Sequence, residues 1–119
     1  MIVTPLIVQV HPGAEDPFET VCQVYVKTLR EGFYIPAGFR FDGASVPWFF
    51  TRILPRFSPR MLVAAVAHDF LYRAPNHHSF TRERADQCFK EILLGLGMNR
   101  AKVTLAFWGV RLGGRFSWK

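Results

Sequence analysis

The first part of the chain alternates between apolar and polar residues with the two-residue period of β-strands. Residues 2–10 are mostly apolar and β-branched and end at a His-Pro-Gly turn. Residues 18–29 (FETVCQVYVKTL) alternate in part, and residues 33–41 (FYIPAGFRF) are extended apart from breaks at Pro36 and Gly38. This pattern is typical of short strands joined by turns. We therefore expect a small antiparallel β-sheet in this part of the chain.

The spacing of the apolar residues changes to that of α-helices after residue 41. Ser58 (followed by Pro59), Thr81 and Asn99 each stand before such a run, and their side chains are those of helix N-caps. Glycines near residues 95–97 and 113–114 mark helix ends. The sequence predicts three main helices, over residues 60–73, 82–96 and 100–112, and a short helix capped by Ser45.

Length and composition favour one folded domain. The chain has 119 residues, of which 50% are hydrophobic, and a domain of this size buries about two-thirds of the surface of its unfolded chain. We expect an α+β fold in which the N-terminal antiparallel sheet is followed by three main helices packed in one core. The single domain would span residues 1–119, with a strand-rich part (1–41), a helical part (45–113) and a short tail (114–119).

The lack of a nucleic-acid-binding motif argues against a nucleic-acid-binding protein despite the positive net charge, and the short apolar runs argue against a membrane-spanning one. A net charge of +6 favours anionic surroundings, but no nucleic-acid-binding motif accompanies it, so nucleic acid is not favoured as a partner. The longest apolar run, residues 61–67, is far shorter than the ~20 residues of a membrane-spanning helix. The start of the chain lacks the basic leader of a signal peptide. We expect a soluble protein with Cys22 and Cys88 as free thiols.

The first main helix places polar residues in a buried setting. Its middle, MLVAAVAHDFLY, is apolar almost all round, so the helix is expected to be buried. His68 and Asp69 lie within it, and burying either group is costly unless it is paired. Tyr72 lies one helical turn after His68, and Asp86 borders the apolar stripe of the next helix. We expect Asp86, or the turn at Asp42, to compensate His68.

Three motifs together resemble a family of uncharacterised proteins found mostly in tailed bacteriophages and prophages. They are IPAGFRFDGASVP (residues 35–47), HDFLYR (68–73) and RADQCF (84–89). The positions that we take as structural motif residues are Gly38, Asp42, Gly43, Ser45, Pro47 and Arg73. The resemblance extends over nearly the whole chain and implies a phage setting more than a particular chemistry.

A second, local resemblance is to the helix core of secreted calcium-dependent phospholipases and their relatives in parvovirus capsids. It is carried by His-Asp-x-x-Tyr on one helix and Ala-Asp-x-x-Phe on the next. It implies that His68 is the general base that activates water. Asp86 would orient the imidazole, with Tyr72 in support. Asp69 would bind Ca²⁺, and Asp42 is a further candidate ligand.

The sequence departs from the phospholipase pattern in two respects. Residues 38–43 (GFRFDG) lack the glycine spacing of the calcium loop, and the disulfide framework is missing. Two other interpretations of the centre therefore stay open. His68, Asp69 and Asp86 can form a satisfied structural network that needs no cofactor. Together with Asp42 they also have the ligand types of a transition-metal site.

The sequence thus supports two functions. The first is a phage-encoded accessory or virion-associated protein, at the tail or its tip, whose His-Asp centre is structural. The second is a phospholipase-like or other metal-assisted hydrolase with His68 as general base. The expected partners are virion or host proteins, or a lipid surface, and a homo-oligomer stays open. The protein would be made in the host cytoplasm and, in the first case, incorporated into the virion.

Overall fold

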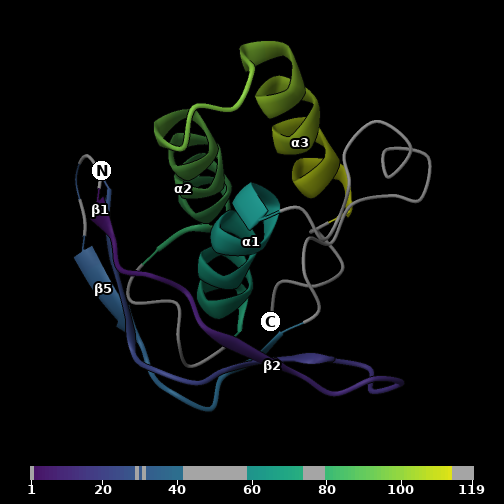
Figure 1. Cartoon of the computed structure of the whole chain (residues 1–119). Helices are drawn as coiled ribbons and strands as arrows, with labels where there is room; N and C mark the ends of the chain where they lie inside the picture. The colour runs from purple at the N-terminus through teal and green to yellow at the C-terminus, as the bar shows by residue number, and fades with distance from the viewer. Residues whose placement is uncertain (1, 29, 31, 42–58, 74–79, 114–119) are drawn as a thin grey trace. The chain divides into compact units, whose positions relative to one another are not determined.

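The computed structural model describes residues 2–28, 30, 32–41, 59–73 and 80–113. The chain divides into two compact units, Met1–Asp42 and Gly43–Lys119. The first holds the strands and the second holds three helices (Figure 1). This order of elements confirms the predicted α+β class. The single core joining both parts stays a prediction, and the short helix predicted at Ser45 lies outside the described residues.

The strand unit contains two three-stranded antiparallel sheets. The first sheet has the order β1-β4-β5, formed by Ile2–Val3, Val24–Lys27 and Gly32–Ile35, and the second has the order β2-β3-β6, formed by Val8–Val10, Phe18–Thr20 and Arg40–Phe41. In the first sheet Val24 lies opposite Ile35 and Val26 lies opposite Phe33. All four side chains are buried. The two-residue alternation of the sequence is therefore the alternation between the two faces of this sheet.

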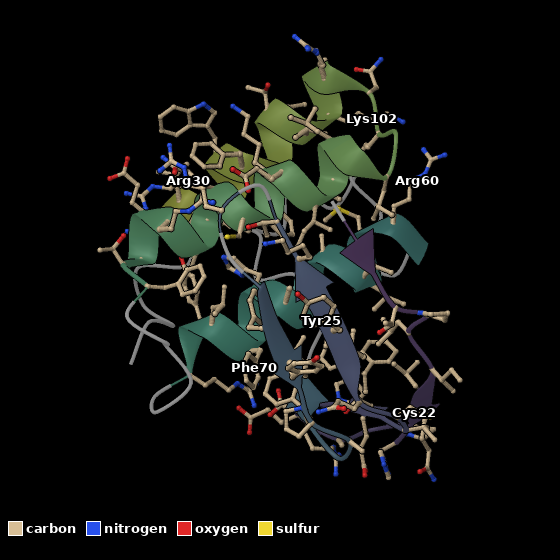
Figure 2. The ribbon with its side chains drawn as sticks, turned by 90° about the vertical axis from the view of Figure 1, so that its left-hand side faces the viewer. Cys22, Tyr25, Arg30, Arg60, Phe70 and Lys102 are labelled. Atoms are coloured by element: carbon tan, nitrogen blue, oxygen red, sulfur yellow. The ribbon has the colours of Figure 1, made fainter. Side chains whose placement is uncertain are left out.

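The other face of the first sheet carries an aromatic pair. Tyr25 of β4, labelled in Figure 2, lies opposite Tyr34 of β5, and the centroids of the two rings are 4.7 Å apart. Cross-strand aromatic pairs of this kind stabilise a sheet. Tyr34 is nevertheless more than half exposed, so this face is the outer one for β5.

The stretch predicted as one strand over residues 18–29 is two strands in the structure. β3 ends at Thr20 and β4 begins at Val24. Val21 and Cys22, between them, are both exposed, which two neighbouring residues of a half-buried strand would not be. The chain leaves one sheet and enters the other at this point. The apolar alternation continues through the break, and for this reason the sequence does not reveal it.

Thr20 and Gly38 hold the turn that leads from β5 to β6. The buried hydroxyl of Thr20 donates to the carbonyl of Pro36 (2.8 Å) and accepts from the amide of Phe39 (2.9 Å). Gly38 has a φ of +84°, a conformation that side chains disfavour. Its amide donates to the carbonyl of Thr20 (2.7 Å). The motif glycine at position 38 thus has a conformational reason within the strand unit.

The three main helices begin and end within a residue or so of their predicted bounds. They are α1 (Pro59–Tyr72), α2 (Arg82–Gly95) and α3 (Arg100–Gly113). Both predicted caps that fall in the described residues are present. The Thr81 hydroxyl accepts from the amide of Arg84 (3.0 Å), and the Asn99 side chain accepts from the amide of Ala101 (2.8 Å). These caps satisfy amides that have no partner inside the helix.

Within the helical unit, α2 packs against both α1 and α3. α1 is buried over almost its whole length, as its apolar sequence predicts, and the buried residues include the polar pair His68 and Asp69. α3 buries a narrower stripe, including Val103 and Val110. None of the helices in the described ranges is long and apolar enough to span a membrane. Cys22 is exposed and Cys88 is buried, and neither forms a disulfide with another described residue.

Candidate functional site

The candidate centre is built mainly from one turn of α1 and one turn of α2. His68 and Tyr72 lie four residues apart on α1, so their side chains share a face of the helix. Asp86 lies on α2 among the buried residues Ala85, Cys88 and Phe89. Because α1 and α2 pack together, this buried carboxylate meets the polar face of α1.

His68 and Asp86 form a direct, fully buried pair. The distance between Nε2 of His68 and Oδ1 of Asp86 is 2.7 Å, and their side chains are 1% and 0% exposed. The imidazole is also fixed by ring contacts. Its centroid lies 4.1 Å from that of Tyr72 and 5.1 Å from that of Phe89. The orientation of the imidazole is therefore set on its edge by a hydrogen bond and on its faces by aromatic packing.

Asp86 has two further partners. The hydroxyl of Tyr72 donates to Oδ1 at 2.5 Å, and Nη1 of Arg111 donates to Oδ2 at 2.8 Å. Arg111 comes from the last turn of α3, and its own carbonyl accepts a hydrogen bond from Arg82 of α2. Both carboxylate oxygens are thus occupied, and the network joins all three helices.

These partners keep Asp86 ionised. Burial raises the pKa of the Asp86 carboxyl, but the hydrogen bond and charge of His68, followed by the hydrogen bonds of Tyr72 and Arg111, outweigh it. The pKa of Asp86 therefore lies below its ordinary value. Burial, and then the hydrogen bond and charge of Asp86, raise the pKa of Tyr72 well above its ordinary value of about 10. Tyr72 thus stays a neutral donor to a charged acceptor.

The second nitrogen of His68 has no hydrogen-bond partner among the residues that the structure describes. An ionised carboxylate only accepts, so Nε2 of His68 carries a proton, and Nδ1 is the nitrogen that carries the lone pair whenever the ring is neutral. Nδ1 is buried, and it and Nε of Arg82 are the two buried side-chain atoms without a partner in the described part of the chain. An unsatisfied buried polar atom costs about 1–3 kcal/mol. A native protein that carries one at a fixed imidazole calls for a chemical explanation.

The structure brings together three of the predicted site residues. His68 and Tyr72 both bind Oδ1 of Asp86. Asp69 is buried beside them in the sequence, with 6% of its surface exposed. Arg73 directly follows α1 and is half-buried. The remaining candidates, all in the motif of residues 35–47, lie outside the described residues: Asp42, Gly43, Ser45 and Pro47.

The described donor set does not fit a metal ion. No three His, Cys, Asp or Glu side chains come together as ligands among the residues that the structure describes. Asp86 has both oxygens engaged by the protein's own donors. Calcium needs six to eight oxygen ligands, and of the predicted pair only Asp69 is described. We therefore derive no chemical step through calcium or a transition metal.

Sequence reasoning missed Arg111 and Arg82. An arginine in the last turn of a helix is ordinarily explained by the helix dipole, and nothing in the pattern distinguishes Arg111 from such a residue. One signal does exist. A buried carboxylate needs hydrogen-bond donors or a cation as partners, and α3 contains basic residues but no acidic residue.

Comparison with known proteins yields a family but no activity. The model of one family, described as "Protein of unknown function (DUF1353)", matches residues 19–110. This range includes both strands of the β4–β5 pair and every residue of the His68 centre except Arg111. No curated protein and no solved structure matches the chain.

Proposed function

The chain belongs to the DUF1353 family of proteins of unknown function, and from its own residues we propose that it is a hydrolase in which His68 is the general base. The observation that carries this proposal is the hydrogen bonding of the two imidazole nitrogens. Nε2 of His68 is bonded to Asp86, whereas Nδ1 is buried and without a partner. A base of this kind needs one nitrogen held by a carboxylate and the other left for water.

The reaction proposed is the hydrolysis of a carboxylic ester. Nδ1 of His68 takes a proton from water as the water oxygen bonds to the ester carbonyl carbon. The resulting imidazolium is stabilised by Asp86 through Nε2. When the tetrahedral intermediate breaks its bond to the alcohol oxygen, the proton passes from Nδ1 to that oxygen. The products are a carboxylic acid and an alcohol, and His68 returns to its starting state.

The residues around Asp86 support this chemistry by positioning. Tyr72 and Arg111 hold the carboxylate at both oxygens, so it cannot turn away from His68. Such second partners fix the tautomer and the orientation of a functional histidine. Because Asp86 stays ionised, the positive charge that forms on His68 during the reaction is met by a negative one.

The experiment is an ester hydrolysis assay with variants that separate chemistry from folding. The substrates are short-chain p-nitrophenyl esters and phospholipid vesicles, with either added calcium or a chelator. We expect His68→Asn and Asp86→Asn to lower kcat by about 10²- to 10⁴-fold. Asn at position 86 offers an amide donor to Nε2, which moves the ring proton to Nδ1 and removes the lone pair.

The control is another histidine–carboxylate pair of the described residues. His11 lies 2.8 Å from Glu19 in the strand unit, with both side chains about one-third exposed. His11→Asn should leave the rate unchanged. The proposal is overturned if the folded wild-type chain hydrolyses none of these esters, or if a folded His68→Asn variant keeps the wild-type rate.

A second candidate function is supported by the burial of the same centre. His68 and Asp86 are almost inaccessible, and the network ties three helices together, as a purely structural clamp would. The chain would then be an accessory or virion-associated phage protein that acts by binding. This proposal predicts that His68→Asn lowers the melting temperature with no activity to lose, and that mass spectrometry detects the protein in purified particles.

A further inference from the structure

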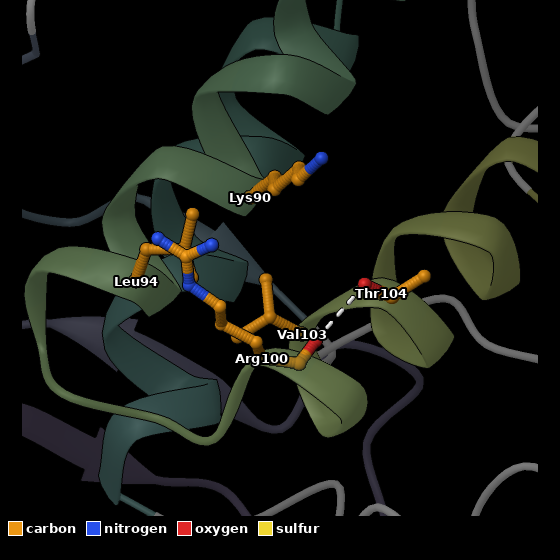
Figure 3. Close-up of a pocket in the computed structure, with 5 residues that line it drawn as sticks. All are labelled: Lys90, Leu94, Arg100, Val103 and Thr104. Carbon is orange, nitrogen blue, oxygen red and sulfur yellow. Dashed lines mark hydrogen bonds between the residues drawn. The ribbon is translucent and has the colours of Figure 1, made fainter.

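A shallow groove lies on the helical unit where the end of α2 meets the start of α3. It has a volume of about 210 Å³. Lys90 and Leu94 of α2 form one side, and Arg100, Val103 and Thr104 of α3 form the other (Figure 3). The volume is smaller than that of a typical small-molecule pocket but accommodates the head of a larger ligand.

The groove has two cations at its rim. The Arg100 side chain extends from the first turn of α3 toward Leu94 (Figure 3). The ammonium group of Lys90 lies 5.3 Å from the centroid of the Phe107 ring. Neither cation has an ion pair within the described ranges. The carboxylate nearest in sequence, Glu91, is bound by Arg84 at 3.0 Å. The groove is therefore suited to an anionic group.

Charge of the same sign surrounds the groove. Between Lys90 and Leu112 the sequence has four basic residues and one acidic residue, and α3 has no acidic residue at all. The N-terminal end of α3, where Arg100 lies, adds the positive end of a helix dipole. Arg111 is the one basic residue of this stretch that an internal carboxylate engages.

An apolar stripe continues from the groove along α3. Trp108 and Leu112 follow Thr104 at four-residue intervals, so they share one face of the helix. Their side chains are 55% and 54% exposed, and Leu94 at the groove is 38% exposed. Exposed Trp and Leu beside Lys and Arg are the composition of helices that lie in the interface of a membrane.

We propose that this face of α2 and α3 binds the surface of an anionic phospholipid membrane. A lipid phosphate lies between Lys90 and Arg100, and Trp108 and Leu112 enter the interfacial layer. A free anion or a nucleic-acid duplex would not bury the apolar stripe, whereas a lipid surface offers phosphates to the cations and an apolar layer to Trp108 and Leu112. The proposal does not depend on any reaction at His68.

The test is cosedimentation with large vesicles of phosphatidylcholine alone, or of phosphatidylcholine containing phosphatidylglycerol. We expect binding to the anionic vesicles and little binding to the neutral ones. A basic residue near an anionic surface contributes about fivefold in affinity, so Lys90→Ala with Arg100→Ala should weaken binding about thirtyfold. Trp108→Ser with Leu112→Ser should weaken vesicle binding equally in low and high salt. The contribution of these two side chains to the affinity is apolar, and salt does not screen it.

Matched controls separate a specific face from net charge. Arg30→Ala with Arg60→Ala removes two exposed cations that belong to neither α2 nor α3, since Arg30 is part of the strand unit and Arg60 is part of α1. Tyr34→Ser removes an aromatic ring that is 57% exposed on the strand unit. Both controls should bind vesicles within about twofold of wild type. Calorimetry with inorganic phosphate, and a binding assay with duplex DNA, cover the other anionic ligands.

Four outcomes overturn the proposal. They are equal binding to neutral and anionic vesicles, an equal loss in the Arg30/Arg60 control, saturable phosphate binding without vesicle binding, and binding of DNA but not of vesicles. Loss of ester hydrolysis in His68→Asn with unchanged vesicle binding would leave the proposal intact. The failure of one proposal is therefore distinguishable from the failure of the other.

Discussion

The helical unit holds charge in two contrasting ways. Around Asp86 the charges are buried, and the chain supplies its own partners from three helices. In the groove between α2 and α3 the charges are near the surface, and no carboxylate of the described chain pairs with Lys90 or Arg100. In the first arrangement every buried polar side-chain atom of the described residues has a partner except Nδ1 of His68 and Nε of Arg82. The second is open.

The contrast shows how much stability each group should contribute. A buried ion that loses its partner leaves an uncompensated charge, which costs far more than the pair itself provides. An exposed cation without a partner loses almost nothing when it is removed. Substitutions in the buried centre should therefore lower the free energy of unfolding, whereas substitutions in the groove should change only what the protein binds.

The largest effect should come from removing the carboxylate at the centre. Asp86→Ala leaves His68, Tyr72 and Arg111 without their shared acceptor, and we expect the free energy of unfolding to fall by about 3–5 kcal/mol. Urea denaturation measures this change. Glu83→Ala removes a carboxylate from an exposed position on the same helix and should cost less than about 1 kcal/mol. Equal losses would remove the distinction between buried and exposed charge.

Protonating Asp86 should remove a part of the same stabilisation. Its pKa is lower in the folded chain, so the unfolded chain binds more protons as the pH falls below about 4, the ordinary value for Asp. The contribution of ionised Asp86 to the free energy of unfolding is therefore fully present above that pH. It is lost as the pH falls toward the pKa of Asp86 in the folded chain. The difference in unfolding free energy between wild type and Asp86→Asn should shrink over this window. A constant difference from pH 6 to pH 2 would contradict the lowered pKa.

Substitution of Arg111 should lower the free energy of unfolding by a smaller amount, because it removes only one partner of Asp86. Arg111→Met keeps an unbranched apolar stem but removes the guanidinium and leaves Oδ2 of Asp86 unpaired, and we expect a loss of about 2 kcal/mol. Arg100→Met is the matched control, since it removes an arginine from the first turn of the same helix. It should change the unfolding free energy by less than about 0.5 kcal/mol. Similar losses for the two variants would mean that Arg111 acts only as an ordinary surface residue.

The two arrangements also differ in how far the sequence predicts them. The helix bounds follow from local signals, because Thr81 and Asn99 cap helices whose apolar spacing is regular. The pairing of His68 with Asp86 follows from a buried imidazole and a carboxylate at the border of the next apolar stripe. Those inferences need only one helix and its neighbour.

What the sequence leaves open depends on longer-range geometry. Arg111 reaches Asp86 from 25 positions away, and the sequence pattern does not specify how α3 is rotated about its axis. The break between β3 and β4 is hidden because Val21 and Cys22 continue an apolar run while facing solvent. The free Nδ1 of His68 depends on the orientation of one ring, which no spacing rule determines.

Tyr72→Phe should produce a modest loss with a distinctive pH dependence. It removes one donor to Asp86, and we expect a loss of about 1 kcal/mol near neutral pH. The pKa of Tyr72 is raised in the folded chain, so this contribution is present below about pH 10, the ordinary value for Tyr, and is lost as the pH rises further. Urea denaturation from pH 8 to pH 11 should show the two chains converging above pH 10. Parallel curves would contradict the raised pKa.

The smallest effect on stability is expected for the two cations of the groove, and it tests directly how they differ from the charges around Asp86. Lys90→Ala with Arg100→Ala removes two cations for which the described chain provides no carboxylate, so the unfolding free energy should stay within about 0.5 kcal/mol of wild type. Lowering a net charge of +6 reduces self-repulsion, which favours a change toward higher rather than lower stability. Thermal and urea denaturation measure it.

The expected absence of a stability change in the Lys90→Ala, Arg100→Ala variant decides how its vesicle binding is interpreted. If the double variant loses vesicle affinity while its stability is unchanged, the two cations serve a partner and not the fold. If instead it unfolds as readily as Arg111→Met, then Lys90 and Arg100 hold α2 and α3 together, and a weakened affinity would report damage to the face. The contrast between the paired charges around Asp86 and the cations of the groove would then not hold, because both sets of charges would stabilise the fold.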